Sequence, residues 1–153
     1  MLGLGNLLLA DEGVGVHAAH ALASWACPEG VSVLDIGTAL LDALPAIESA
    51  DRVIVIDAMK ADGTPGTVYR IPYAECARAD IIASMHGFDL SRVLALAGRA
   101  EPPDVLVFGV EPQLIEWSLE LSPAVAAALP AVVAAVREEI ERYGEASTAA
   151  SPA

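Results

Sequence analysis

The sequence of 153 residues is poor in basic side chains, in aromatic side chains and in cysteine. Eight Lys and Arg stand against 21 Asp and Glu, for a formal net charge of −13. A nucleic acid or an anionic membrane would meet a surface of its own charge, so we expect neither as a partner. The charge fits a cation or a basic protein partner, or serves solubility alone. No apolar run reaches the ~20 residues needed to span a bilayer.

The two cysteines, Cys27 and Cys76, match neither a zinc spacing nor a disulfide framework. That usage is typical of a reducing compartment. Met1 and Leu2 open the sequence without the basic segment of a signal peptide, so we expect a cytoplasmic protein. Aromatic residues make up 5% of a sequence that is 55% hydrophobic, so the core must be mainly aliphatic. The length suggests one domain.

Strand and helix patterns alternate along the chain. Val53 to Ile56 is an unbroken β-branched run, which indicates a central strand buried on both faces. Residues 66–72 alternate apolar and polar side chains, which is typical of an edge strand. The pattern predicts strands at 1–5, 31–36, 51–57, 66–72 and 104–110, and helices at about 13–26, 39–48, 89–98 and 123–143. We therefore expect an α/β three-layer sandwich with a mostly parallel sheet of about five strands, a single domain over 1–145 and a disordered tail over 146–153.

In such a sheet, ligands bind beyond the carboxyl ends of the strands. Asp11 and Glu12 follow the first strand; we expect Asp11 to cap the next helix and Glu12 to remain free. Asp57 closes the central strand, and His86 lies in a connecting segment. Two carboxylates and one imidazole suit a divalent ion such as zinc or nickel. The ordinary alternatives are that Asp57 caps a turn and that His86 is a loop histidine.

Other interpretations are weaker. Gly3 and Gly5 precede a helix as in a dinucleotide-binding turn, but Leu8 stands where the third glycine is needed. Ser84 lacks the glycines of a nucleophile elbow. His17 and His20 lie three residues apart on the first helix, a spacing that can bind a metal but more commonly marks an ordinary helix surface.

The stretch Gly3–Gly15 (GLGNLLLADEGVG) resembles the N-terminal signature of the nickel–iron hydrogenase maturation endopeptidases. The resemblance continues along nearly the whole chain. It is carried by the segments Asp35–Thr38, Val53–Ala58, Pro65–Thr67, Ser84–Gly87, Phe108–Pro112 and Leu121–Pro123.

The resemblance implies an endopeptidase that removes a C-terminal extension from the nickel-loaded precursor of a hydrogenase large subunit. It places nickel binding and catalysis on Glu12, Asp57 and His86, with the nickel carried by the substrate and a surrogate divalent ion as a possible replacement. Asp35 and Thr38 would orient those ligands. We expect a monomer or weak oligomer. The alternatives are a non-enzymatic metal- or partner-binding module on the same scaffold and a nucleotide-binding domain.

Overall fold

The computed structural model describes residues 1–78 and 87–150 of the chain. Within them, one sheet has the strand order β2-β1-β3-β5-β4, with β4 antiparallel to β5 and the other pairs parallel. The strands are β1 (Leu2–Leu4), β2 (Leu34–Gly37), β3 (Arg52–Ala58), β4 (Val68–Pro72) and β5 (Asp104–Val110). The helices are α1 (Val14–Ala23), α2 (Leu44–Ser49), α3 (Tyr73–Arg78), α4 (Gly87–Leu96) and α5 (Pro123–Ala150), with 3₁₀ turns η1 (Ala10–Gly13) and η2 (Leu40–Ala43).

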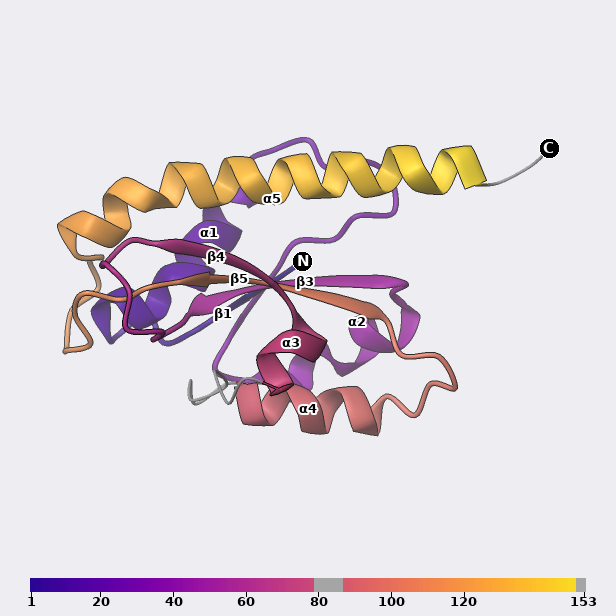
Figure 1. Cartoon of the computed structure of the whole chain (residues 1–153), viewed down its shortest axis with the longest axis horizontal. Coiled ribbons are helices and arrows are strands. Elements are labelled where there is room, and N and C mark those ends of the chain that lie inside the picture. Colours follow the sequence, from indigo (N-terminus) through magenta and orange to yellow (C-terminus); the bar gives the residue numbers. More distant parts are fainter. Residues whose placement is uncertain (79–86, 151–153) are drawn as a thin grey trace.

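Helices cover both faces of the sheet (Figure 1). Alternate side chains of β3 point to opposite faces, so Val53 and Val55 enter one apolar cluster and Ile54 and Ile56 enter the other. The first cluster includes side chains of η2, α2 and α4, and the second includes those of α1 and α5. The sheet and the helices on its two faces are the three predicted layers. The aliphatic residues of β3 contribute to the apolar cores on both faces.

The predicted α/β class, the mostly parallel sheet and the edge position of the strand near 66–72 are confirmed. Several boundaries differ from the prediction; the strand expected at 31–36, for example, is Leu34–Gly37. The first helix begins as a 3₁₀ turn and ends at Ala23, and the last helix continues to Ala150. Residues 146–150 are therefore helical and not a disordered tail, in keeping with the high helix propensity of their alanines. No helix in the described ranges is long and apolar enough to cross a membrane.

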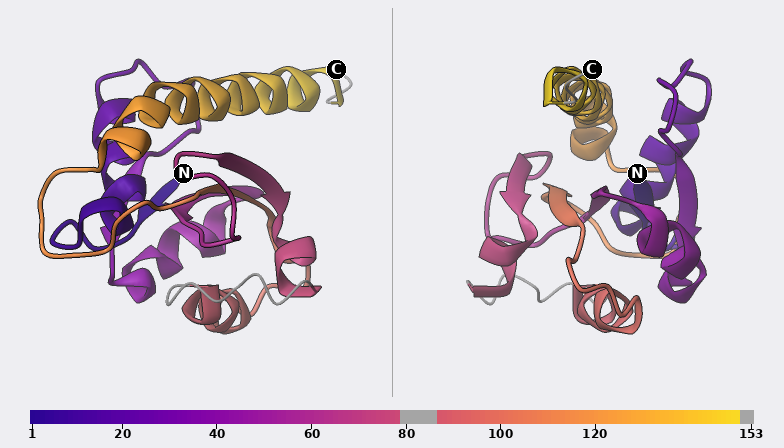
Figure 2. Two further views of the ribbon diagram at one scale, coloured as in Figure 1. Left: turned by 60° about the vertical axis from the view of Figure 1, so that its left-hand side comes forward. Right: turned by 90° about the vertical axis from the view of Figure 1, so that its right-hand side faces the viewer.

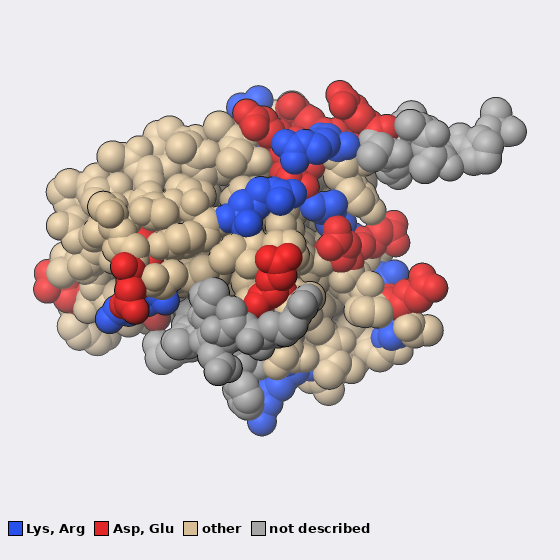
Figure 3. All heavy atoms as spheres, viewed as in Figure 1, with Lys and Arg blue, Asp and Glu red and all other residues tan. Residues whose placement is uncertain are grey.

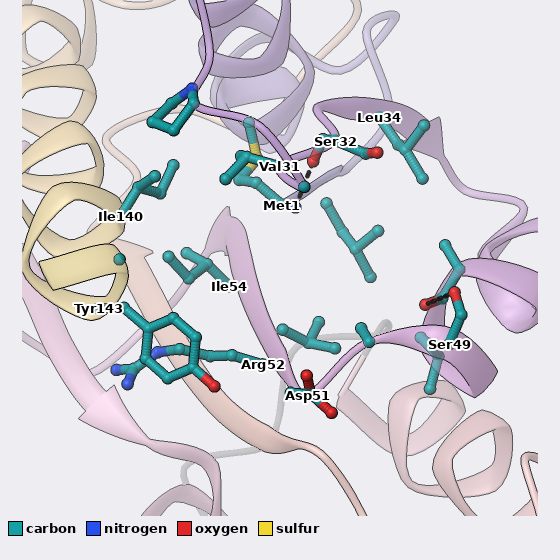
Figure 4. Close-up of a pocket in the computed structure, with 18 of the residues that line it drawn as sticks. Met1, Val31, Ser32, Leu34, Ser49, Asp51, Arg52, Ile54, Ile140 and Tyr143 are labelled. Atoms are coloured by element: carbon teal, nitrogen blue, oxygen red, sulfur yellow. Dashed lines mark hydrogen bonds between the residues drawn. The ribbon is translucent and has the colours of Figure 1, made fainter. Parts of the chain in front are cut away.

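A cavity of about 530 Å³ lies at the amino ends of the strands (Figure 4). Leu2 of β1 pairs with Val55, whereas β3 already begins at Arg52. Over those first residues of β3 the sheet has no β1 neighbour, and the cavity opens between β3, the segment 28–34 and the C-terminal part of α5. This cavity is at the opposite edge of the sheet from Glu12, so it is not the predicted metal site.

Two arginines of the sheet hold α5 through one buried carboxylate, which a third arginine, on the helix itself, also contacts. Glu139, 4% exposed, binds Arg52 of β3 at 2.6 Å, Arg70 of β4 at 2.9 Å and Arg142 of its own helix at 2.9 Å. Blue and red side chains gather below the C-terminal half of α5 in Figure 3. A buried carboxylate needs such partners because its desolvation is costly.

Asp11 joins the segment after β1 to the segment after β5. Its carboxylate is fully buried and accepts hydrogen bonds of 2.7 to 2.8 Å from the amides of Gln113, Leu114 and Ser122 and from the Ser122 hydroxyl. The predicted cap is wrong, because the side chain bonds neither the first turn of η1 nor that of α1. The distant segment offers the carboxylate four donors, more than a helix end supplies.

We expect Asp11→Asn to lower the free energy of unfolding by about 2–4 kcal/mol. An amide keeps one acceptor oxygen and turns an NH₂ group toward donors, so part of this network is lost and some donors stay unpaired. Urea unfolding measures the change. Asp42→Asn, at an exposed position, is the matched control and should shift stability by less than about 0.5 kcal/mol. An equally small shift for Asp11→Asn would contradict the assigned role.

Candidate active site

Glycines bring the start of α1 against the sheet backbone. A Cβ on Gly15 would lie 2.1 Å from the carbonyl oxygen of Ile56, and one on Gly3 would lie 2.2 Å from the carbonyl oxygen of Gly15. Gly5 has φ +123°, and a Cβ there would lie 1.7 Å from the carbonyl oxygen of Glu12. Any side chain would push the helix away. The glycines thus serve close packing rather than phosphate binding, and they set Glu12 against the carboxyl end of β1.

Glu12 is a buried carboxylate with an unsatisfied oxygen. The residue is 7% exposed, and its Oε2 has no hydrogen-bond partner in the described part of the chain. A buried polar atom without a partner costs about 1–3 kcal/mol. The atom is therefore suited to a ligand that supplies positive charge from outside the protein.

Asp57 lies at the same edge, near the carboxyl end of the neighbouring strand β3. It is 6% exposed, and it follows Ile56, whose carbonyl contacts Gly15 one turn after Glu12. Its Oδ1 accepts the amide of Ala58 at 2.8 Å, so the turn-capping role is also present. Because the carboxyl ends of parallel strands meet at one edge of the sheet, the two predicted carboxylates lie at the same edge.

His86 lies outside the described residues, so the third predicted ligand has no described position. In the ranges 1–78 and 87–150, no group of three or more His, Cys, Asp and Glu is arranged to hold a metal ion. The set of Glu12, Asp57 and His86 therefore stays a prediction.

The two histidines of α1 differ in their surroundings. His20 is exposed and its Nε2 lies 2.8 Å from Oδ2 of Asp35, so it is the ordinary surface residue that we expected. Asp35 and Thr38 were expected to orient the metal ligands; Asp35 makes this contact with His20, Thr38 is exposed, and their orienting role stays a prediction. His17 is half-buried, and its Nε2 is buried without a partner among the described residues. This ring is therefore more enclosed than the ordinary helix-surface position that we expected.

The sequence analysis missed Glu111, which follows β5 at the same edge. It is 3% exposed, and its Oε2 accepts the Ala61 amide at 2.9 Å and the Tyr69 hydroxyl at 2.8 Å. Burial acts to raise the pKa of Glu111, but these hydrogen bonds and the nearby Lys60 outweigh it, so the pKa lies below the ordinary 4.5. The ionised carboxylate thereby holds the loop after β3 in place. The sequence feature that could have identified Glu111 is its position directly after a buried strand.

The lowered pKa of Glu111 predicts a stability component that is full above pH 4.5 and is lost as the pH falls through the lower pKa of the folded state. We expect Glu111→Gln to cost about 1 kcal/mol at neutral pH and to flatten the loss of stability below pH 4.5. Thermal unfolding as a function of pH measures both effects. Glu120→Gln, at an exposed position, should keep the wild-type profile. If Glu111→Gln lost stability below pH 4.5 as steeply as the wild type does, the stabilising role assigned to the Glu111 carboxylate would be contradicted.

Curated relatives and solved structures resemble the chain over nearly its full length. A hydrogenase 2 maturation protease of Escherichia coli (strain K12) is 36% identical over 147 aligned residues, covering 90% of this chain and 90% of the relative. A hydrogenase expression/formation protein HupD of Thiocapsa roseopersicina is 33% identical over 164 residues, covering 99% and 74%. The structure of the hydrogenase maturating endopeptidase HybD from E. coli superposes with a TM-score of 0.84 at 31% identity, covering 94% and 91%.

A family model agrees with these relatives. The model described as hydrogenase maturation protease matches residues 16–139, which is most of the chain. The fold, the relatives and the family model therefore lead to one conclusion: the chain belongs to the hydrogenase maturation protease family, and it is a peptidase.

Proposed function

We propose that the protein removes the C-terminal extension of a nickel-loaded hydrogenase large-subunit precursor. We further propose that it recognises the nickel ion on that precursor through Glu12, Asp57 and His86. The observation that carries this proposal is the buried Glu12 Oε2, which lacks a partner within the described residues. A cation brought by the substrate would satisfy that atom.

Charge supports the same proposal. Glu12 and Asp57 are 7% and 6% exposed at one edge of the sheet, where water screens them poorly. Two carboxylates that meet in such a place would repel each other, and a divalent cation bound between them would relieve that repulsion. An imidazole completes an oxygen and nitrogen set that suits nickel.

In this proposal nickel belongs to the substrate. The ion places the scissile peptide bond at the site, as a template does. Hydrolysis then adds one water across the C–N bond, giving a carboxylate on the processed subunit and an amine on the released peptide. A precursor without nickel offers Glu12 and Asp57 no cation, so it is not positioned and is not cut. The reaction would take place in the cytoplasm, with the enzyme as a monomer or weak oligomer.

Glu12→Gln should lower kcat/KM on nickel-loaded precursor by at least about 100-fold, because a neutral amide holds the cation poorly and the bond is misplaced. The variant should fold as stably as the wild type, since glutamine keeps the shape of the side chain and replaces a carboxylate whose Oε2 lacks a partner within the described residues. Mass spectrometry of the released C-terminal peptide measures cleavage, and melting curves measure stability. Glu29→Gln, at an exposed position, is the matched control. Wild-type cleavage by Glu12→Gln would refute the assigned ligand.

Nickel dependence is tested on the substrate side. Precursor loaded with nickel should be cut, and the same precursor without nickel should remain intact at equal enzyme concentration. Equal rates on both forms would refute recognition of the ion while leaving the peptidase assignment in place.

A further inference from the structure

Exposed apolar side chains are concentrated on two segments at the carboxyl edge of the sheet. Eight large hydrophobic residues of the described chain are exposed, and five of them lie here, with Trp117 at 80%. We call this group the apolar platform; it consists of Leu8, Leu114, Ile115, Trp117 and Leu119. Scattered exposed apolar residues need no explanation, but a cluster of this kind is typical of an interaction site.

The platform is held by hydrogen bonds rather than left as a loose loop. Ser118 donates its amide to the Leu8 carbonyl at 3.0 Å and accepts the Ala10 amide at 2.9 Å, and Leu9 pairs with Ser118 in a parallel bridge. The Asp11 amide donates to the Leu114 carbonyl at 3.2 Å. Figure 2 shows the orange segment between β5 and α5 beside the indigo segment that leads into α1.

The buried Asp11 carboxylate completes this support. It binds the amides of Gln113 and Leu114 at one end of the segment and Ser122 at the other. The apolar side chains between these ends are therefore presented on a fixed backbone. A partner that binds such a surface pays little to order it, which favours affinity.

The platform is continuous with the candidate active site. Asp11, which holds the platform, is adjacent in sequence to Glu12, and both are buried in the same 3₁₀ turn. The platform also carries charge of one sign, because the exposed residues Glu116 and Glu120 alternate with its apolar members. Its complement is an apolar patch bordered by basic side chains.

We propose that the apolar platform is the docking surface for the protein substrate, the hydrogenase large-subunit precursor. Trp117 is its central anchor, and Glu116 and Glu120 pair with basic residues of the precursor. This inference rests on the proposed function for the identity of the partner. A site that binds one ion through a few atoms offers too little contact area to hold a whole protein. The platform beside it supplies that contact area.

The platform variants are Trp117→Ser and Leu119→Ser, and the matched control is Leu96→Ser, at a site on α4 that is 61% exposed. Binding of each variant to immobilised nickel-loaded precursor gives Kd, and peptide release gives kcat and KM. Trp117→Ser should raise Kd and KM at least about tenfold, the usual effect of losing an aromatic anchor. Its kcat at saturation should stay within about twofold, and Trp117→Phe should recover most of the affinity. Leu96→Ser should match the wild type.

Melting curves verify that every variant is folded, which is expected because the changed side chains are exposed. Wild-type Kd and KM in Trp117→Ser, or no binding of precursor by the wild-type protein, would overturn the proposal. Light scattering tests whether the platform instead binds a second copy of the chain. If the wild type is a dimer, and Trp117→Ser makes it a monomer without changing its affinity for precursor, the platform serves self-association and the proposal is overturned. If the wild type binds precursor through Trp117 but never cuts it, the platform stands and the proposed function fails.

Discussion

The direct backbone contact between α1 and the sheet is the constraint on which the site depends. Gly15 lies so close to Ile56 of β3 that a single added carbon would clash with its carbonyl oxygen, and Gly3 makes the reciprocal approach from β1. The helix start is therefore set by backbone contact instead of by flexible side chains. This geometry buries Glu12 beside Gly5, which follows β1, and at the same edge as Asp57, the penultimate residue of β3, so the two carboxylates are positioned before any ligand arrives.

Local patterns were sufficient for most of the fold. The strand Asp104–Val110 was predicted to the residue, because a short valine-rich apolar run that follows two prolines favours a buried strand. The edge position of β4 followed from the alternation near Tyr69, whereas its antiparallel pairing with β5 was not predicted. The end of the last helix was missed because small residues after Tyr143 resemble a tail, although alanine also favours helix. Local sequence favours both states there.

The positions of the site residues could be predicted only where they follow from the topology of the sheet. Strand order alone brings Glu12 and Asp57 to one edge, and the structure buries both there. The partners of Asp11 could not be predicted, because they lie 102 to 111 residues further along the chain. Glu111 could have been noticed as an acid after a buried strand, but its partners Ala61 and Tyr69 come from other segments and could not be predicted. Hydrogen bonds between residues so far apart in the sequence depend on the folded backbone, and a short stretch of sequence does not reveal them.

The long span between Asp11 and Ser122 also has a consequence during synthesis. A ribosome makes the turn that carries Glu12 early and the residues that bind the Asp11 carboxylate 102 to 111 residues later, so this turn lacks its support until most of the polypeptide has emerged. Closing a loop of this length is an entropic cost that is met late in folding. A nascent chain that ends before Gln113 should therefore lack this support for the turn that carries Glu12.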